Sequence, residues 1–252
     1  TITSTSGTQV FTGNFQIGSL TASSANSSFA GSTVTFNTLT HNGGTILLTG
    51  NGAQALTTNA QTFNNLTLTN IGTDIITVTG NLNINGNLEV QENQTLSLTT
   101  NNLSVTGTTN AAAGNNGTIT STDGEQTFIG NFQIGSLTAS SVNSSFAGSA
   151  VTFHTLDHNS GTILLTGNGA QALTTNAQTF NNLTLSNVGT DTITVSGALN
   201  ISGNLEVQEN QTLSLTTNSL SVTGTTNAVA GNSGTITSTS GTQVFTGNFQ
   251  IG

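Results

Sequence analysis

The sequence predicts an all-β protein, a parallel β-solenoid, on the strength of three observations. The first is a tandem repeat: TITSTSGTQVFTGNFQIG at residues 1–18 returns as TITSTDGEQTFIGNFQIG at 118–135 and unchanged at 235–252. The second is the alternation of apolar and polar residues in short bursts, which is the period of a strand. The third is composition. Thr, a strand former, is the commonest residue, Asn and Gly suit turns, and Pro, which interrupts strand pairing, is absent.

The repeat divides the chain into two full copies, 1–117 and 118–234, and the start of a third copy at 235–252. The two full copies differ at 18 of 117 positions, so 99 are identical. Near-identical tandem copies without a gap are typical of arrays in which each unit packs against the next. We therefore expect one continuous solenoid and a structural role that is needed many times, whereas an active site is needed once.

The strands of copy one are predicted from six bursts in which apolar residues recur at every second position. The bursts lie at 62–70, 75–80, 81–86, 87–90, 94–100 and 101–107. Gly, Asn or Ser follows each burst within a few residues, and no window shows the i, i+3, i+4 spacing of a helix. The inward-facing pairs are expected to be Leu66 and Leu68, Leu82 and Ile84, Leu96 and Leu98, and Leu103 and Val105.

Two architectures suit short strands separated by regular turns, namely antiparallel sandwiches and a parallel solenoid. The solenoid is favoured because the bursts are short for sandwich strands and because stacked coils allow ladders of Asn side chains. Coils of about 20–25 residues give about five coils per 117-residue repeat, or six at the short end of that range. The twelve Phe residues recur in phase and are predicted to lie in the core or in stacked ladders.

Charge and cysteine content exclude several classes of protein. The chain has no Lys, no Arg and a net charge of −9, so it lacks the cations that bind phosphates or an anionic membrane surface. It has no Cys for disulfides or thiolate metal sites and no apolar run long enough to span a membrane. We expect no nucleic-acid partner and no membrane insertion. The missing initiator Met suggests a processed product or part of a longer protein.

Acidic and histidine residues are the candidates for chemistry, and the sequence assigns them none. The nine carboxylates are interpreted as solvated turn residues, with a weak calcium site as the alternative. A lyase would need the missing Arg or Lys, and Glu89 and Glu92 would not face one way on a strand. These carboxylates are Asp74, Glu89, Glu92, Asp123, Glu125, Asp157, Asp191, Glu206 and Glu209.

The three histidines are His41, His154 and His158. A strand over 153–159 would place His154, Leu156 and His158 on one face, with the two His residues about 13 Å apart, too far to share a zinc ion. The prediction is therefore no enzyme, no cofactor, and no catalytic, cofactor-binding or metal-binding residue.

Pairs of the form Thr-x-Thr raise a different possibility. Thr67 with Thr69, and Thr77 with Thr79, point outward if the neighbouring apolar residues point inward. A flat array of outward Thr on a solenoid is a geometry used for ice binding. The pairs are expected, however, to be scattered among the bursts and not to recur once per coil. Ice binding is thus the less favoured alternative.

The segment 44–107 resembles a known group of repeats. Its QTFNNLTL step at 61–68 and the later spacing N-L-x-I-x-G-x-L-x-V … L-x-L … N-x-L-x-V-x-G are similar to repeats of adhesin-like bacterial surface proteins, broadly like filamentous haemagglutinins. Residues 161–224 repeat the pattern, and 23–42 fit it less well. The resemblance implies a right-handed parallel β-helix at the cell surface or outside the cell.

Together these observations favour a structural extracellular protein. It would form or decorate a filament, stalk or sheath, either by end-to-end stacking of chains or by covalent tandem repeats. Its main partner would be itself. The alternative is a surface adhesin whose side binds glycans or a solid surface.

Overall fold

The structure of the chain, a computed structural model, describes residues 1–69, 72–110, 117–227 and 234–251. All regular secondary structure in these residues is β-strand, and every pairing given for them is parallel. The prediction of an all-β parallel solenoid is confirmed, and antiparallel sandwiches are excluded. The chain forms two compact units, Thr1–Gly124 and Glu125–Gly252, and about twelve turns in all. The copy boundaries at 117 and 234 remain predictions.

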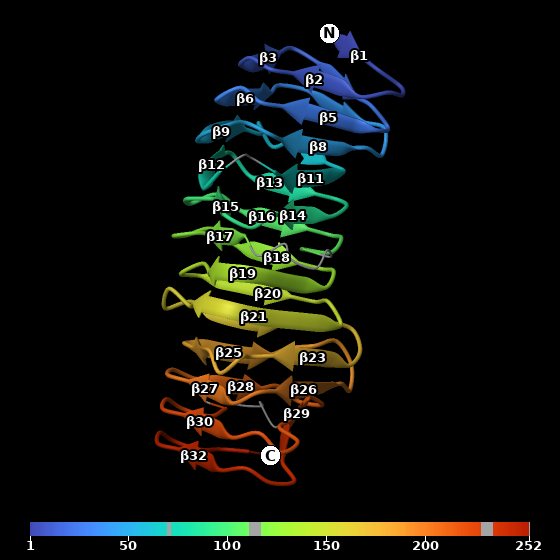
Figure 1. Cartoon of the computed structure of the whole chain (residues 1–252). Coiled ribbons are helices and arrows are strands. Elements are labelled where there is room, and N and C mark those ends of the chain that lie inside the picture. The colour runs from blue at the N-terminus through green and yellow to red at the C-terminus, as the bar shows by residue number, and fades with distance from the viewer. Residues whose placement is uncertain (70–71, 111–116, 228–233, 252) are drawn as a thin grey trace. The chain divides into compact units, whose positions relative to one another are not determined.

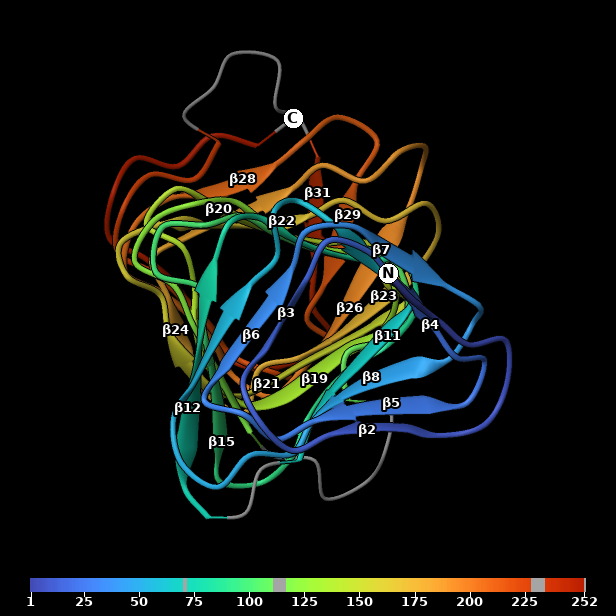
Figure 2. The same cartoon turned by 90° about the horizontal axis from the view of Figure 1, so that it is seen from above.

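Unit one is a coil with three walls (Figures 1 and 2), and Figure 2 shows β2, β5 and β8 on one side, β3 and β6 on another and β4 and β7 on the third. Wall A consists of β3 (Phe15–Ile17), β6 (Thr33–Phe36), β9 (Gln54–Thr57), β12 (Asp74–Thr79), β15 (Gln94–Ser97) and β17 (Thr118–Thr120). Wall B consists of β2 (Gln9–Phe11), β5 (Asn26–Phe29), β8 (Thr45–Leu48), β11 (Asn65–Leu68) and β14 (Leu88–Val90). Wall C holds two short ladders, β1 (Ile2–Thr3), β4 (Leu20–Ala22) and β7 (Leu39–His41), then β10 (Thr62–Phe63), β13 (Leu82–Ile84) and β16 (Leu103–Val105).

Unit two repeats this organisation. Its wall A consists of β19 (Phe132–Thr138), β21 (Ala150–Asp157), β23 (Gln171–Thr174), β26 (Thr192–Ser196), β29 (Thr212–Ser214) and β31 (Thr235–Thr237). Its wall B consists of β18 (Gln126–Phe128), β20 (Asn143–Phe146), β22 (Thr162–Leu165), β25 (Asn182–Leu185) and β28 (Leu205–Val207). Its wall C consists of β24 (Thr179–Phe180), β27 (Leu199–Ile201), β30 (Leu220–Val222) and β32 (Gln243–Phe245).

The coils differ in length. Along wall B of unit one, the coil that runs from Gln9 to its partner Ser27 is shorter than the coil that runs from Leu66 to its partner Leu88. The five strands of this wall are followed by a bridge from Leu88 to Thr109, which gives six stacked positions in the described part of the unit. Copy one therefore spans nearly six coils, at the upper end of the sequence estimate, because its other wall B coils are shorter than the one between Leu66 and Leu88.

The core is built as the sequence predicts. All eight residues expected to face inward, from Leu66 to Val105, are at most 1% exposed. They alternate along their strands with half-buried or exposed polar residues, as in the buried–intermediate–buried pattern of β13, β14 and β16. Because parallel neighbours are in register, inward residues stack on inward residues of the adjacent coils, as Leu66 does on Ile46 and Leu88.

Phenylalanine rings form a continuous ladder inside each unit. In unit one the Phe29 ring stacks on Phe11 with centroids 4.9 Å apart, and the Phe36 ring meets Phe29 at 5.2 Å and Phe63 at 5.4 Å. Unit two has an equivalent ladder that runs through Phe128, Phe146, Phe153 and Phe180. These contacts confirm the predicted stacked Phe ladders.

The first coils have a partly polar interior, which explains why 23–42 departs from the apolar pattern seen later in the copy. Ser27 is fully buried and its hydroxyl donates to Gln9 Oε1 at 2.7 Å, while the Ser23 amide donates to the same oxygen at 3.0 Å. In unit two Ser144 donates to Gln126 Oε1 at 2.6 Å, and both side chains are fully buried. The segment forms strands like its neighbours, but hydrogen bonds replace apolar contacts on part of its inner face.

Asparagine side chains link successive coils, mostly through bonds to backbone groups of the adjacent coil and less through the predicted ladders of Asn side chains. Asn59 Nδ2 donates to the Phe36 carbonyl oxygen and to Asn37 Oδ1, both at 3.1 Å. In a later coil Asn101 Nδ2 donates to the Val78 carbonyl oxygen at 3.0 Å. Each bond spans one coil in the sequence, so these turns are tied to each other as well as to their own strands.

At the described positions, the differences between the copies avoid the core. None of the described positions among the 18 is buried in either copy. The changes that add a carboxylate, Ser6 to Asp123, Thr8 to Glu125 and Thr40 to Asp157, all fall on exposed residues. Repetition thus preserves the interior, as the sequence comparison suggests.

The first strands of copies two and three lie on wall A of their units, whereas the equivalent strand of copy one lies on wall C. Strand β1 belongs to wall C and pairs with β4, but its copy-two equivalent β17 pairs with β15 and extends wall A. In unit two β31 likewise pairs with β29 of wall A, and β32, the equivalent of β2, pairs with β30 of wall C. Copies therefore follow one another without filling a whole number of coils.

Glycine at position 44 is required by the approach of the neighbouring coil. A Cβ there would lie 1.9 Å from the Ala25 carbonyl oxygen and 2.2 Å from that of Ser23. Because backbone would have to move, we expect Gly44→Ala to lower the free energy of unfolding by about 1–3 kcal/mol in urea unfolding followed by circular dichroism.

Gly18 supplies the control, since a Cβ there meets nothing within 4 Å. Gly18→Ala should be neutral or stabilise by about 0.4–1 kcal/mol. Equal losses for the two variants would contradict this account of Gly44.

Candidate functional site

The most regular surface of unit one is the outer face of wall A. Three columns of outward residues run across its strands, and register fixes each residue beside its neighbour in the next coil. The columns are Thr33–Ala55–Thr77–Ser97–Thr120, Thr35–Thr57–Thr79 and Ile75–Thr95–Thr118. We call these eleven residues the wall A surface. Nine of the eleven carry a hydroxyl, and none is charged.

Wall A gathers some of the Thr-x-Thr pairs but not all of them. A pair of outward residues separated by one buried residue occurs in each of five successive coils, at 33 and 35, 55 and 57, 77 and 79, 95 and 97, and 118 and 120. Three of these five are Thr-x-Thr, and the Thr67 pair starts on wall B, so the expected scatter is confirmed in part. The pair at 95 and 97 is displaced along the strand, because Thr77 lies beside Ser97 and Ile75 lies beside Thr95.

The hydroxyl groups of this surface are left for solvent. In the described part of unit one, the hydroxyls of Thr35, Thr57, Thr77 and Thr79 make no hydrogen bond within the protein. Thr58, next along the chain but buried, instead donates to the Asn81 carbonyl oxygen at 2.8 Å. Parallel pairing on both sides holds the backbone of the inner strands, so neighbouring coils place their Thr residues about 4.7–4.9 Å apart, and the two residues of one strand lie about 6.6 Å apart.

Wall B does not share this composition, whereas wall C does. The central outward column of wall B reads Val10–Ser28–Leu47–Thr67–Glu89. In wall C the outward columns read Thr3–Thr21–Thr40 over the early strands and Thr62–Asn83–Ser104 over the later strands. Wall A differs from wall C in that its ladder is continuous from β3 to β17, whereas the strands of wall C form two separate ladders.

Unit two carries an equivalent surface on its own wall A. Its columns are Ala150–Ala172–Thr194–Ser214–Thr237, Thr152–Thr174–Ser196 and Thr192–Thr212–Thr235. Nine of these eleven residues again carry a hydroxyl. The two surfaces differ at three of their eleven equivalent positions, where Thr33, Ile75 and Thr79 become Ala150, Thr192 and Ser196. Each change keeps an uncharged side chain.

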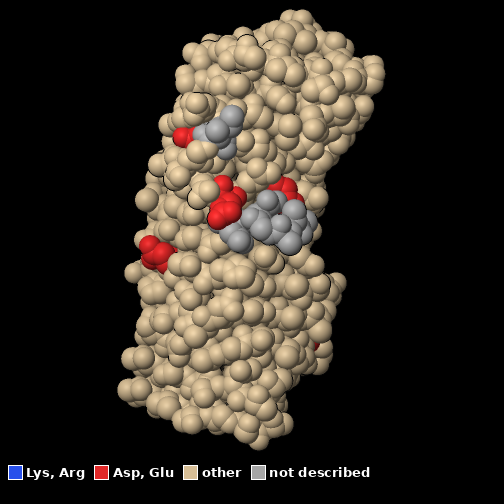
Figure 3. Space-filling model, viewed as in Figure 1, with Lys and Arg blue, Asp and Glu red and all other residues tan. Residues whose placement is uncertain are grey.

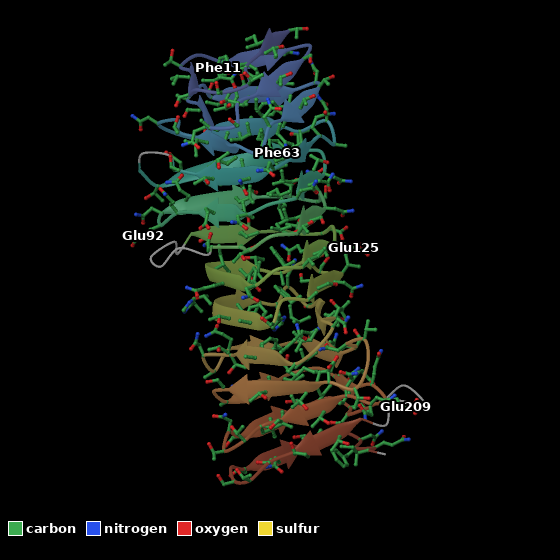
Figure 4. All side chains as sticks on the ribbon, turned by 90° about the vertical axis from the view of Figure 1, so that its right-hand side faces the viewer. Phe11, Phe63, Glu92, Glu125 and Glu209 are labelled. Carbon is green, nitrogen blue, oxygen red and sulfur yellow. The ribbon has the colours of Figure 1, made fainter. Side chains whose placement is uncertain are left out.

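Several of the nine carboxylates hold turns. Asp74 Oδ2 accepts the Gly52 amide at 3.0 Å, and Asp191 Oδ2 accepts the Gly169 amide at 2.9 Å, each one coil away. Asp123 accepts the Gly124 amide and Asp157 the Asn159 amide. Glu92 and Glu209 are exposed in turns, while Phe63 lies among the interior side chains (Figure 4). The acidic residues form small, separate patches on the face in Figure 3.

The remaining Glu residues are also at the surface. Glu89 and Glu206 are outward on β14 and β28, and Glu125 is exposed. Bonds from Asp74 and Asp191 to turns one coil away are a structural role that sequence reasoning missed. The only signal in the sequence was the identical placement of the Asp in both copies.

The prediction that His154, Leu156 and His158 share one strand face is wrong. Leu156 is buried at 9% exposure and Phe153 is fully buried, whereas His154 is exposed. Two buried residues three positions apart break the strand alternation, because the chain turns from one wall to the next between them, as it does between β6 and β7 in unit one. His158 Nδ1 accepts the Ser160 amide in a turn at 3.0 Å, and His41 ends β7.

Within the described ranges, no three or more His, Asp or Glu side chains gather as metal ligands would. No helix capable of crossing a bilayer was found in the same residues. Comparison with protein-family models, curated proteins and solved structures gave no match. The wall A surface, whose eleven residues are Thr, Ser, Ala and Ile, is taken as the candidate functional site.

Proposed function

We propose that this protein is a structural array, in which tandem copies extend one solenoid into a stalk, filament or sheath. The observation that carries the proposal is the identity of the two copy junctions. Thr95, Leu96 and Ser97 pair with Thr118, Ile119 and Thr120 where copy two begins, and Thr212, Leu213 and Ser214 pair with Thr235, Ile236 and Thr237 where the third copy begins.

The junctions have the same backbone pairing as the coils inside a copy. The Gly117 amide donates to the Val90 carbonyl oxygen at 3.1 Å, and the Gly234 amide donates to that of Val207 at 3.0 Å. A junction made by strand pairing without a spacer transmits position and force from one copy to the next. Additional copies joined in this way would lengthen the solenoid without adding a hinge.

Burial of equivalent residues shows what a following coil covers. Phe132 and Ile134 of copy two are 2% and 0% exposed, whereas their third-copy equivalents Phe249 and Ile251 are 49% and 37% exposed. The same apolar side chains are thus covered where coils follow them. Either a covalently continuous copy or the first coil of another chain would provide such a cover, and both give a fibre.

The test is the length of particles as copies are added. The 252-residue chain is extended by one, two and four further copies of residues 136–252, which continue the 117-residue repeat in phase, and is imaged by electron microscopy. Each copy should add about 27 Å, because about 5.7 coils stack at about 4.8 Å per coil. The control carries a flexible Gly-Ser linker between residues 117 and 118 and should bend there.

Length that does not grow in proportion to copy number would contradict the proposal, as would particles that bend at every junction as freely as the linker variant. Microscopy of the unextended chain separates the two routes to a fibre. End-to-end rods indicate stacking of chains, and single particles leave covalent continuity as the route.

The finer parts of the proposal rest on the sequence resemblance alone. Similarity of 44–107 to adhesin-like bacterial surface repeats supports a right-handed coil and a place at the cell surface or outside the cell. Antibody labelling of intact and permeabilised source cells would test the location. Labelling only after permeabilisation would contradict it.

A further inference from the structure

Outward hydroxyl groups are distributed unevenly over the three walls. Thr suits any outward strand position, so propensity alone would distribute it evenly. Instead nine of the eleven wall A residues and five of the six residues in the wall C columns of unit one carry hydroxyls, while the column on wall B includes Val10, Leu47 and Glu89. Wall A is the larger of the two hydroxyl-rich faces, because its ladder is continuous and that of wall C is divided in two. The copies preserve this bias, because the substitutions that add carboxylates all lie off the wall A surface.

The properties of the surface restrict what it can bind. Its eleven residues carry no charge, so it does not fit a charged polymer, and none of them is aromatic and able to stack on a sugar ring or a base. Among the described residues its central Thr hydroxyls have no partner in the protein, and they stand in rows fixed by the backbone. A rigid two-dimensional grid favours a partner that has a matching repeat of its own, since each hydroxyl then finds an equivalent site without reorganisation.

We propose that the wall A surface binds ice, a lattice of water whose oxygen atoms repeat in two dimensions. Each Thr offers a hydroxyl that can donate and accept and a methyl group that limits the orientations of adjacent water. Spacings of about 4.7–4.9 Å between coils and about 6.6 Å along a strand set the grid of these groups. Individual contacts are weak, and the repetition over five coils supplies the binding energy.

The surface is complete within unit one and again within unit two, so this inference does not depend on the filament proposal. Its failure is also distinguishable, because activity towards ice and particle length are separate measurements. An array of copies would raise the number of grids per molecule, and activity per mole should then rise with copy number.

The experiment measures thermal hysteresis and inhibition of ice recrystallisation by the 252-residue chain. The test variant is Thr77→Tyr with Thr194→Tyr, equivalent exposed positions in the middle of the two wall A surfaces. The control is Thr67→Tyr with Thr184→Tyr, the same change at outward positions of wall B. Circular dichroism confirms that both variants keep their strand content.

We expect hysteresis from the unaltered chain and the control, and its loss in the wall A variant. No effect of the unaltered chain on ice growth would overturn the proposal, as would equal activity of the two variants. If the wall A variant changes sedimentation while none of the proteins affects ice, the surface packs on a second copy of the chain and the ice proposal is wrong.

Discussion

Replacing Phe29 with Ala is expected to lower the free energy of unfolding by about 3–5 kcal/mol, the largest effect of any single side chain considered. The ring is fully buried and touches three others, with centroids 4.9 Å from Phe11, 4.8 Å from Phe15 and 5.2 Å from Phe36. Removing it leaves a cavity that adjacent coils cannot close, because backbone pairing fixes their spacing.

Urea unfolding followed by circular dichroism measures the loss, and native-state hydrogen exchange locates it in unit one, since repeat proteins need not unfold in one step. Phe146→Ala, the equivalent change in unit two, should have a similar effect on its own unit. Val10→Ala, at a position 65% exposed, should stay within about 0.5 kcal/mol of the unaltered chain. A loss below about 1 kcal/mol for Phe29→Ala would contradict the predicted rigid core.

The second large effect is expected at Asn110, whose side-chain amide forms the hydrogen bonds to Val90 of β14 that a neighbouring strand's backbone would otherwise form. Its Oδ1 accepts the Val90 amide at 2.7 Å, its Nδ2 donates to the Val90 carbonyl oxygen at 3.2 Å, and the residue is 2% exposed. Its φ of 51° lies in the left-handed region, which Asn tolerates better than most residues. Asn110→Ala leaves a buried amide without a partner and strains the backbone, at a total cost of about 2–5 kcal/mol.

Asn110→Gly separates the two contributions. Glycine accepts the positive φ, so this variant should lose only the hydrogen bonds and should be about 1 kcal/mol more stable than the Ala variant. Asn227 in unit two, with φ of 52° and a 2.7 Å bond from the Val207 amide, allows the same comparison. The same urea and hydrogen-exchange measurements apply. If Gly and Ala variants are equally stable, backbone strain has no part in the effect.

The sequence predicted the strands and their inward residues because those depend on local alternation. Leu66, Leu82 and Val105 each sit in a burst with period two, and each is buried as expected. The Phe ladder was likewise predictable, because positions such as Phe63 and Phe180 recur with the period of the tandem repeat. The presence of a strand and the burial of its residues can thus be predicted from short stretches of sequence.

Features that depend on register or on corners were not predictable. Thr77 lies beside Ser97 and not beside Thr95, because the coil between them differs in length from the coils before it. His154 lies at a corner where the alternation shifts, and a single alternating strand was the wrong assumption there. Asp74 reaches the Gly52 amide in the preceding coil, a contact that requires knowing which turns stack. Each miss concerns the length of a coil, which no local pattern encodes.

The offset at the copy junctions sets a longer period than the sequence repeat. In the described residues copy one supplies sixteen strands, β1–β16, and the Thr109 bridge, which makes seventeen positions on three walls. Seventeen is not divisible by three, so in an array whose junctions all repeat these two pairings a given strand returns to its wall only after three copies. Unless the number of junctions between its first and last copies is a multiple of three, such an array would therefore end with a given strand on a different wall from the one it occupied in the first copy.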